Sequence, residues 1–354
     1  MDTLFKIPIL SISMGDPAGI GPEVCLKALL HPKVQKCCVP IVVGDLKTLK
    51  FHAKKMKIRN RLRSIDSSEI NHLKDNELNF SPVIDLGNVR VNKNMFGKAR
   101  PSFGQASAKY IQVGVELIKS KLTDAIVTGP IHKEAFNSAG YIYPGHTEFL
   151  TSLVGGGKPV MMFCHPKMKI AHLSTHCSLK DALKKVRKKQ IVDVGKIFFH
   201  SLQSMGFENP RIAVAALNPH SGEGGLFGSE EIKEIIPAVK KLQSFGMDIV
   251  GPVSPDVVFS MNRDGVFDGV IAMYHDQGHI PGKMIGFNFN KRGTMVRAVN
   301  VTLGLPIIRT SVEHGTGFEI AGKGVASEMS MVDALVLASK MVKSKKRTKP
   351  IIHN

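Results

Sequence analysis

Short apolar runs alternate with longer amphipathic segments along most of the chain. The run IPILSIS (7–13) precedes a helix-like segment at 22–30, and the amphipathic segment 108–122 precedes the run DAIVTGP (124–130). Runs of this length that are rich in β-branched residues are typical of buried strands, whereas apolar positions three or four residues apart indicate a helix. Further strand-like runs lie at 37–45, 158–164, 169–175, 211–219, 248–255 and 268–276. The alternation predicts an α/β fold with mostly parallel sheets.

The composition is that of a globular protein with reduced thiols. The 354 residues are 43% hydrophobic, which is enough for a core in each of two ordinary domains. The five cysteines are odd in number and form no C-x-x-C pair, so the sequence encodes neither a disulfide framework nor a four-thiolate zinc site. Free thiols and the lack of a long uncharged apolar run favour a cytoplasmic protein without a membrane partner.

The formal net charge of +19 is the strongest compositional signal. A basic protein can bind nucleic acid, an anionic membrane or small phosphorylated molecules. Lysines and arginines are spread along the chain, and the sequence has no tryptophan and only four tyrosines for stacking on bases. We therefore expect no nucleic-acid partner, whereas a small anionic substrate is compatible with the charge.

Two glycine-rich segments follow predicted strands. In GDPAGIGPE (15–23) the glycine spacing matches neither the dinucleotide-binding fingerprint G-x-G-x-x-G nor the phosphate-loop motif. The physical interpretation is a tight turn closed by Asp16, with Pro22 at the start of a helix. In NPHSGEGGLFGSEE (218–231) the glycines flank a histidine and a glutamate, which favours backbone held close to a ligand or a metal ion.

Three of the fourteen histidines come just after the carboxyl end of a predicted strand, namely His176, His220 and His275. Ligands of open α/β sheets collect at this edge. Three imidazoles with an open fourth position form a known catalytic Zn²⁺ arrangement, and imidazole also binds Co²⁺ and other transition ions. His172 lies four residues before His176 on the same strand face and competes as a ligand. A hydrogen-bonding structural role is the alternative for each single histidine.

Several segments together resemble the 4-hydroxythreonine-4-phosphate dehydrogenase (PdxA) family. They occur in the family's order and span nearly the whole chain: MGDPAGIGPE, DAIVTGPIHKEAF, YPGHTEFL, NPHSGEGGLFGSEE, AMYHDQGHIPGK and NVTLGLPIIRTSVEHGTGFEIAGKG. The resemblance implies a divalent metal ion (Zn²⁺, Mg²⁺ or Co²⁺) held by the three histidines His176, His220 and His275. It also implies five substrate-binding residues, which are His146, Thr147, Lys283, Asn300 and Arg309.

The resemblance extends to the cofactor, the domains and the oligomeric state. The segment 313–324 resembles the adenine-nucleotide loop of the isocitrate and isopropylmalate dehydrogenases, which implies that NAD or NADP contacts His314, Gly315 and Thr316. We expect two α/β/α domains of that type, not of the Rossmann type. Residues 1–135 with 300–354 would form the cofactor side and residues 136–299 the metal and substrate side, with the active-site cleft between them. Relatives build their sites between protomers, so a homodimer with shared active sites is expected.

Two segments depart from the family's pattern. After His176 the family usually has an aliphatic residue and proline, whereas this chain has Cys177 and Ser178. The ligand itself is retained. The segment FNFNKRGTMVRAV (287–299) is several residues longer than expected, which affects the loop after Lys283 and the role of Asn300.

The implied function is NAD(P)-dependent oxidation of 4-phosphooxy-L-threonine to 2-amino-3-oxo-4-phosphooxybutanoate, a step of pyridoxal phosphate (vitamin B6) biosynthesis. The product would lose CO₂ and give 3-amino-2-oxopropyl phosphate. The metal ion would lower the pKa of the substrate hydroxyl while the nicotinamide accepts hydride. Lys283 and Asp256 are both candidates for the base. The rival interpretations are a dehydrogenase of a related hydroxy acid, a metal-dependent phosphohydrolase or aldolase, and a non-catalytic phosphate or nucleic-acid binding protein.

Overall fold

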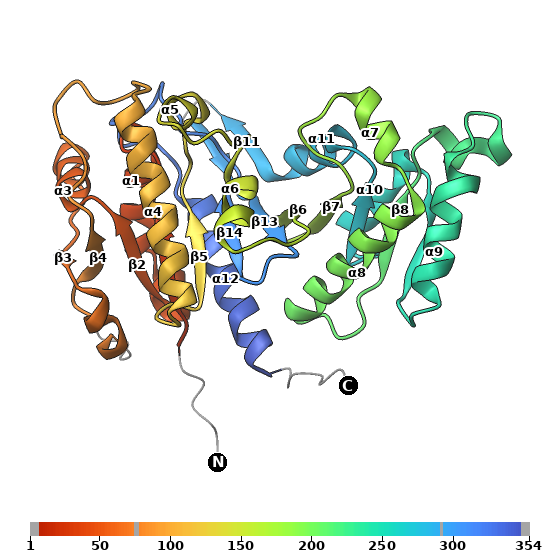
Figure 1. Cartoon of the computed structure of the whole chain (residues 1–354), viewed down its shortest axis with the longest axis horizontal. Helices are drawn as coiled ribbons and strands as arrows, with labels where there is room; N and C mark the ends of the chain where they lie inside the picture. Colours follow the sequence, from red (N-terminus) through yellow and green to blue (C-terminus); the bar gives the residue numbers. More distant parts are fainter. Residues whose placement is uncertain (1–6, 74–77, 291–292, 348–354) are drawn as a thin grey trace, which may run out of the picture. The chain divides into compact units, whose positions relative to one another are not determined.

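The computed structural model describes residues 7–73, 78–290 and 293–347. The chain divides into two units: unit 1 comprises Met1–Gly157, Phe289–Val299 and Leu305–Asn354, and unit 2 comprises Lys158–Asn288 and Asn300–Gly304. Each unit is an α/β/α body built on a mostly parallel arrangement of strands (Figure 1), which confirms the predicted fold class. Among the described helices, none combines the length and apolar composition that a membrane span requires.

The strands of unit 1 pair in parallel. Their order is β3 (Leu62–Ser64), β4 (Ser81–Asp85), β2 (Val39–Gly44), β1 (Ile9–Ser13), β5 (Ala125–Thr128) and β14 (Arg309–Val312). Every residue of β1 and β5 is buried, because helices cover both faces of these central strands. Parallel pairing brings the carboxyl ends of β1, β5 and β14 to one edge, where ligands bind in folds of this kind.

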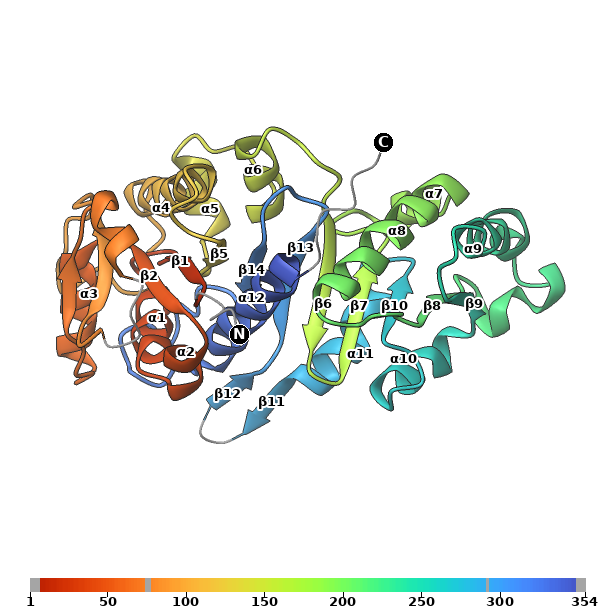
Figure 2. The same cartoon turned by 90° about the horizontal axis from the view of Figure 1, so that it is seen from below.

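Helices cover both faces of the unit 1 strands (Figure 2). One face carries α4 (Pro101–Lys119), α5 (Lys133–Ser138) and α6 (His146–Leu153), and the other carries α1 (Gly21–Leu29), α2 (Pro32–Cys37) and α12 (Met329–Arg347). The connections contain α3 (Leu46–Lys55) and the 3₁₀ helix η1 (Ser67–His72). Helix α4 approaches β5 closely because residue 114 is glycine: a Cβ atom on Gly114 would lie 2.7 Å from Cδ1 of Ile126.

The strands of unit 2 include an antiparallel pair. Their order is β13 (Val299–Leu303), β6 (Val160–His165), β7 (Met168–His172), β10 (Gly269–Ala272), β8 (Ile212–Ala215) and β9 (Ile249–Val253). β6 and β7 are antiparallel, because the short turn between them cannot form the crossover that parallel pairing needs. β7, β10, β8 and β9 are parallel neighbours, so their carboxyl ends share one edge.

Helices also cover both faces of the unit 2 strands. Figure 2 shows α7 (Leu179–Lys185), α8 (Lys188–Ser204) and α9 (Ile236–Gln243) on one face, and α10 (Pro255–Arg263) and α11 (His275–Gly286) on the other. The connection after β8 contains the 3₁₀ helix η2 (Pro219–Gly225) and the π-helix η3 (Glu231–Ile235). The three candidate metal ligands therefore lie just beyond the carboxyl ends of β7, β8 and β10.

The long segment 287–299 contains a separate hairpin. β11 (Phe287–Asn290) pairs with β12 (Gly293–Val296) in a two-stranded sheet. Arg297 is the residue directly after β12. Its guanidinium donates to both carboxylate oxygens of Asp333 on α12, at 3.0 and 3.1 Å. The length beyond the family's pattern thus coincides with a hairpin that leaves strand β13, which contains Asn300, intact.

The unit boundary differs from the predicted domain bounds. The second domain was expected to begin at residue 136, whereas residues 136–157 belong to unit 1. The reason is apolar packing: Phe149 and Leu150 of α6 join Ile111 and Phe136 in one buried cluster of that unit. The chain likewise returns to unit 1 at residue 289, and only residues 300–304 of the following segment belong to unit 2.

The segment 15–23 forms the predicted tight turn, and Asp16 closes it. Asp16 Oδ1 accepts a hydrogen bond from the backbone N–H of Ala18 at 2.8 Å. Helix α1 begins at Gly21, its N-cap is Ile20, and Pro22 lies in its first turn. Asp16 is fully buried, and burial raises the pKa of its carboxyl group to about 7.

We expect Asp16→Asn to remove a pH-dependent cost of folding, because the amide keeps the oxygen that accepts from Ala18 and carries no charge. In the unfolded chain the Asp16 carboxyl ionises near pH 4, whereas its pKa in the folded chain is about 7. The folded state binds the additional proton between these values, so stability falls as the pH rises from about 4 to about 7. The measurement is the free energy of unfolding in urea at a pH below this window and at a pH above it. The free energy of the variant relative to the wild type should be greater at the higher pH, by at most about 4 kcal/mol. The same difference at both pH values would contradict a protonated Asp16.

Candidate functional site

Two of the three predicted metal ligands line one pocket of unit 2. His176 follows β7, and His275 is the first residue of α11, just after β10. Their ring centroids lie 5.8 Å apart, and both rings can reach one ion at this separation because each Zn–N bond is about 2 Å long. The pocket has a volume of about 410 Å³ and is lined by Ser174, Thr175, His176, Cys177, Ser178, Leu179, Ala182, Tyr274, His275 and Asp276.

Asp276 orients the ring of His275. Its Oδ1 atom lies 2.6 Å from Nδ1 of His275, so Nδ1 donates to the carboxylate and the Nε2 lone pair of the neutral ring remains for a metal ion. The same hydrogen bond lowers the pKa of Asp276. A carboxylate behind the imidazole is the usual second partner of a metal-binding histidine. The donor chemistry at His275 therefore fits the predicted metal ion.

The backbone at His176 and His220 adopts a conformation that is rare for residues with side chains. The φ angle is +44° at His176 and +49° at His220, and Ser221 and Glu223 also have positive φ. Such conformations cost about 1–3 kcal/mol each and cluster at ligand-binding and catalytic sites. This backbone strain supports a functional role for both segments.

His220 is not among the residues that line this pocket. It belongs to η2, and its ring centroid lies 6.5 Å from that of Phe227. Within residues 7–73, 78–290 and 293–347, no three His, Cys, Asp or Glu side chains form a group that could hold a metal ion. One chain thus brings two of the predicted ligands together, and the role of His220 stays a prediction.

His172, the predicted competitor for the metal ion, has other partners. It is the last residue of β7 and only 2% exposed. Its Nδ1 lies 3.3 Å from the carbonyl oxygen of Met161, and its Nε2 lies 3.0 Å from Nδ1 of His279. Burial, with a smaller effect of His279, lowers the pKa of His172 to about 3. Both ring nitrogens are engaged within the protein, so His172 has no lone pair for a metal ion.

The departure at residues 177 and 178 leaves the pocket intact. Ser178 is the N-cap of α7: its hydroxyl oxygen accepts from the backbone N–H of Asp181 at 3.1 Å and donates to the Asp181 carboxylate at 2.7 Å. Serine is among the best residues at this position. The helix therefore begins directly after the turn that contains His176.

Arg309 is a buried cation at the edge of unit 1 where β5 ends. It begins β14, is 3% exposed, and donates through Nη2 and Nε to the hydroxyl of Thr128 at 2.7 and 3.2 Å. Burial lowers the pKa of Arg309 to about 10, while the carboxylates of Glu313 and Glu148 raise it. A desolvated guanidinium of this kind is suited to bind an oxyanion through its planar fork.

His146 lies close to Arg309. It is the first residue of α6, and its Nε2 atom is buried without a hydrogen-bond partner among the described residues. Burial, followed by the charge of Arg309, holds the pKa of His146 well below its usual value. An unpaired buried nitrogen is a position that a ligand can satisfy. The two predicted substrate residues therefore form one group within unit 1.

The other predicted substrate residues are distributed over both units. Thr147 follows His146 in α6, and its carbonyl oxygen accepts from the hydroxyl of Thr151 at 2.7 Å. Lys283 is exposed on α11 of unit 2. Asn300 lies in β13, and its side-chain oxygen is buried without a hydrogen-bond partner in the described part of the chain.

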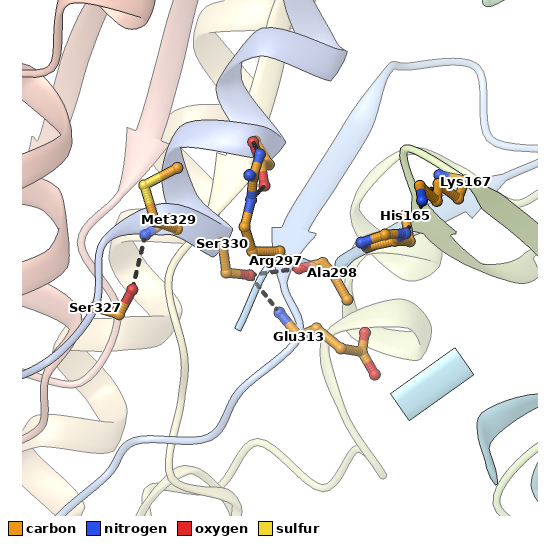
Figure 3. Close-up of polar contacts among 9 residues, drawn as sticks. His165, Lys167, Arg297, Ala298, Glu313, Ser327, Met329 and Ser330 are labelled. Atoms are coloured by element: carbon orange, nitrogen blue, oxygen red, sulfur yellow. Dashed lines mark hydrogen bonds and ion pairs between the residues drawn. The ribbon is translucent and has the colours of Figure 1, made fainter. Parts of the chain in front are cut away.

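The predicted cofactor loop begins directly after β14 and is anchored to α12. In Figure 3 the hydroxyl of Ser330 donates to the carbonyl oxygen of Ala298 at 2.6 Å and accepts from the backbone N–H of Glu313 at 3.0 Å. His314 follows Glu313 in this loop, and its Nδ1 atom lies 3.0 Å from the carbonyl oxygen of Gly315. Nε2 of His314 is buried without a partner among the described residues, and burial lowers the pKa of the ring.

The glycine-rich turn 15–23 packs against this loop. The backbone N–H of Ile20 donates to the carbonyl oxygen of Thr316 at 2.8 Å, and a Cβ atom on Gly19 would lie 2.7 Å from the same oxygen. Gly19 is therefore required for backbone contact with the predicted cofactor loop. This explains a glycine-rich turn that lacks the phosphate-binding spacing.

The structure singles out neither candidate base. Lys283 and Asp256 are both exposed, on α11 and α10 of unit 2. The Ser254 hydroxyl, with a smaller effect of His220, lowers the pKa of Asp256, which makes it a weaker base. Sequence reasoning missed Asp276 and Thr128. Asp276 could have been found as the carboxylate next to a candidate ligand, whereas Thr128 meets Arg309 only through the pairing of β5 with β14.

Comparison with known proteins assigns the chain to a family. Residues 36–338 match the family described as "Pyridoxal phosphate biosynthetic protein PdxA". A D-threonate 4-phosphate dehydrogenase of Cupriavidus necator is 41% identical over 330 residues, which cover 93% of this chain and 96% of that protein.

Solved structures agree with this assignment. A 4-hydroxythreonine-4-phosphate dehydrogenase of Burkholderia phymatum is 42% identical, with a TM-score of 0.79, over 95% of this chain and 98% of that chain. Its counterpart from Klebsiella pneumoniae is 37% identical, with a TM-score of 0.82, over 95% and 99%. The chain therefore belongs to the PdxA family and is an oxidoreductase.

Proposed function

We propose that the protein oxidises the 3-hydroxyl group of a four-carbon, 4-phosphorylated hydroxy acid, with NAD or NADP and a divalent ion (Zn²⁺, Mg²⁺ or Co²⁺). The observation that carries this proposal is the pocket that His176 and His275 line in a chain of the PdxA family. The first candidate substrate is 4-phosphooxy-L-threonine. The second is D-threonate 4-phosphate, which the name of the Cupriavidus necator relative favours.

The residues of the chain have separate tasks in this reaction. His176 and His275 would hold the ion, which supplies Lewis-acid polarisation of the substrate hydroxyl. Asp276 keeps the Nδ1 hydrogen of His275 directed away from the ion. Arg309 binds an oxyanion of the substrate, and the loop with His314 contacts the nucleotide, whose nicotinamide accepts hydride.

The product of this oxidation is a compound that loses CO₂. Removal of two electrons and two protons from the C3 alcohol gives a 3-keto acid. Such an acid loses CO₂ because the neighbouring carbonyl accepts the electrons of the broken bond. From 4-phosphooxy-L-threonine, in the biosynthesis of pyridoxal phosphate, the product is 3-amino-2-oxopropyl phosphate.

The test is reduction of NAD and NADP with each candidate substrate, before and after chelation and with Zn²⁺, Mg²⁺ or Co²⁺ added back. We expect nucleotide reduction that stops on chelation and returns with the metal ion, because the ion activates the hydroxyl. Release of phosphate or of an aldehyde without nucleotide reduction would favour a hydrolase or an aldolase and overturn the proposal. The ratio of rates on the two substrates identifies the preferred group at C2.

We further propose a homodimer in which His220 from a second copy completes the metal site. The support is that His176 and His275 line one pocket, whereas His220 of the same chain does not line it. A two-fold symmetric dimer would form two such sites.

Joint refolding of two inactive variants tests the dimer. In a His220→Ala and His275→Ala heterodimer, one of the two sites would receive an intact set of ligands, so partial activity should return. Mixing His176→Ala with His275→Ala is the matched control, because both ligands come from the same chain and no intact site forms. Background activity in verified heterodimers of the first pair would contradict a site completed by His220 of the second copy.

A further inference from the structure

We propose that His279 is a positioning residue for His275, and that His172 in turn fixes His279. This inference rests on the proposed function, because it takes His275 as a metal ligand. His279 and His172 are both buried, and neither is among the residues that line the pocket.

The ring of His279 stacks on the ring of His275. The two residues are four apart on α11, which places them one above the other on the same side of the helix. Their ring centroids lie 4.0 Å apart, and the angle between the ring planes is 6°. This face-to-face contact limits rotation of the His275 ring about its side-chain bonds. The carboxylate of Asp276 holds the edge of the same ring, so His275 is restrained from two directions.

A chain of hydrogen bonds holds His279 in place. The carbonyl oxygen of Met161 lies 3.3 Å from Nδ1 of His172 and can only accept, so Nδ1 of His172 carries the hydrogen atom. In the neutral ring Nε2 is then an acceptor, and Nδ1 of His279, 3.0 Å away, must donate to it. The backbone of β6 thereby fixes the orientation of both rings.

The two histidines are buried, and a glycine on α11 allows their close contact. His172 is 2% exposed and His279 is 5% exposed. Gly278 lies between them: a Cβ atom there would lie 2.5 Å from Nε2 of His172 and 2.8 Å from Cγ2 of Ile170. Only glycine lets α11 come close enough to β7 for the hydrogen bond between the two rings.

Paired variants separate the stacking from the hydrogen bond. In His279→Asn the amide nitrogen takes the place of Nδ1 and still donates to His172, but the stacked ring is lost. In His279→Phe the stacked ring is kept and the donor is lost. Because the stack acts on His275, His279→Asn should weaken Co²⁺ binding by about 10- to 100-fold, the usual effect of changing a residue behind a metal ligand. His279→Phe should weaken it less.

The measurement is Co²⁺ affinity by chelator competition, with the visible absorption spectrum of bound Co²⁺ and the melting temperature of the apoprotein recorded alongside. His200→Asn and His200→Phe are matched controls, because His200 is exposed on α8 and bonds Gln203. A merely structural role would lower the melting temperature of the His279 variants and leave the affinity and the spectrum of the folded protein unchanged. That outcome would overturn the inference.

Variants of His172 keep the test decisive if the His279 variants do not fold. His172→Gln retains an oxygen that accepts from His279 and should keep Co²⁺ affinity near the wild-type value, whereas His172→Leu removes the acceptor and should weaken binding. Equal affinities in the two variants would overturn the inference. His275→Ala separates this result from the proposed function. If that variant binds Co²⁺ normally, the metal site is wrong; if it loses Co²⁺ while the His279 and His172 variants bind normally, only the positioning role is wrong.

Discussion

Replacement of His275 by alanine should reduce turnover to background and lower metal affinity by at least about 100-fold, because changes behind a ligand already cost 10- to 100-fold. The ring of His275 lines the candidate pocket. Because Nδ1 donates its hydrogen to Asp276, the lone pair of Nε2 is available to bind the ion. Metal content after dialysis and the rate of NAD(P) reduction are the measurements.

The loss should not arise from unfolding. The side chain of His275 is 33% exposed and its ring stacks on His279, so its truncation should lower the free energy of unfolding by about 0.5–3 kcal/mol. That cost is smaller than the roughly 5–15 kcal/mol by which a folded domain is stable, so the variant should stay folded. His200→Ala, which removes an exposed ring from α8, is the control and should keep both metal and activity. Wild-type metal content and rate in His275→Ala would remove this residue from the site.

The fold could be predicted because buried strands leave a local pattern in the sequence. The apolar runs 7–13, 124–130 and 268–276 contain β1, β5 and β10, since a strand covered on both faces is mostly apolar. The order of the strands is not a local property: β5 pairs with both β1 and β14, which are far apart in the sequence. The unit boundary escaped prediction for the same reason, because the position of α6 depends on which core Phe149 enters.

The candidate site was predictable to the extent that it depends on strand ends. His176 and His275 line one pocket because they follow the adjacent parallel strands β7 and β10. His220 follows the neighbouring strand β8, but the backbone from His220 to Gly224 has positive φ throughout, and spacing does not predict the path of such a segment. The strand period also could not show that His172 is engaged by Met161 and His279.

Replacement of Arg309 should have the second large effect, which is a loss of substrate affinity. We expect Arg309→Lys to weaken binding of the phosphorylated substrate by roughly 10- to 100-fold, because loss of a charge-assisted contact costs about 1.5–3 kcal/mol. Lysine keeps a positive charge beside Glu148 and Glu313 but cannot form the planar fork. Arg309→Ala should bind substrate still more weakly and should also destabilise unit 1, since it leaves both carboxylates without that cation.

The nucleotide provides the internal comparison for this prediction. Because Arg309 is assigned to the substrate, the dissociation constants of NAD and NADP, measured by calorimetry on Arg309→Lys, should stay at their wild-type values. Arg297→Lys is the matched control: Arg297 also forms a two-bond contact, with Asp333 (Figure 3 shows Arg297), but has no predicted part in the site, so its replacement should change neither affinity. Equal losses of nucleotide and substrate binding in Arg309→Lys would place Arg309 in the cofactor pocket. Unchanged binding of both would mean that the buried charge of Arg309 has a structural role and binds no ligand.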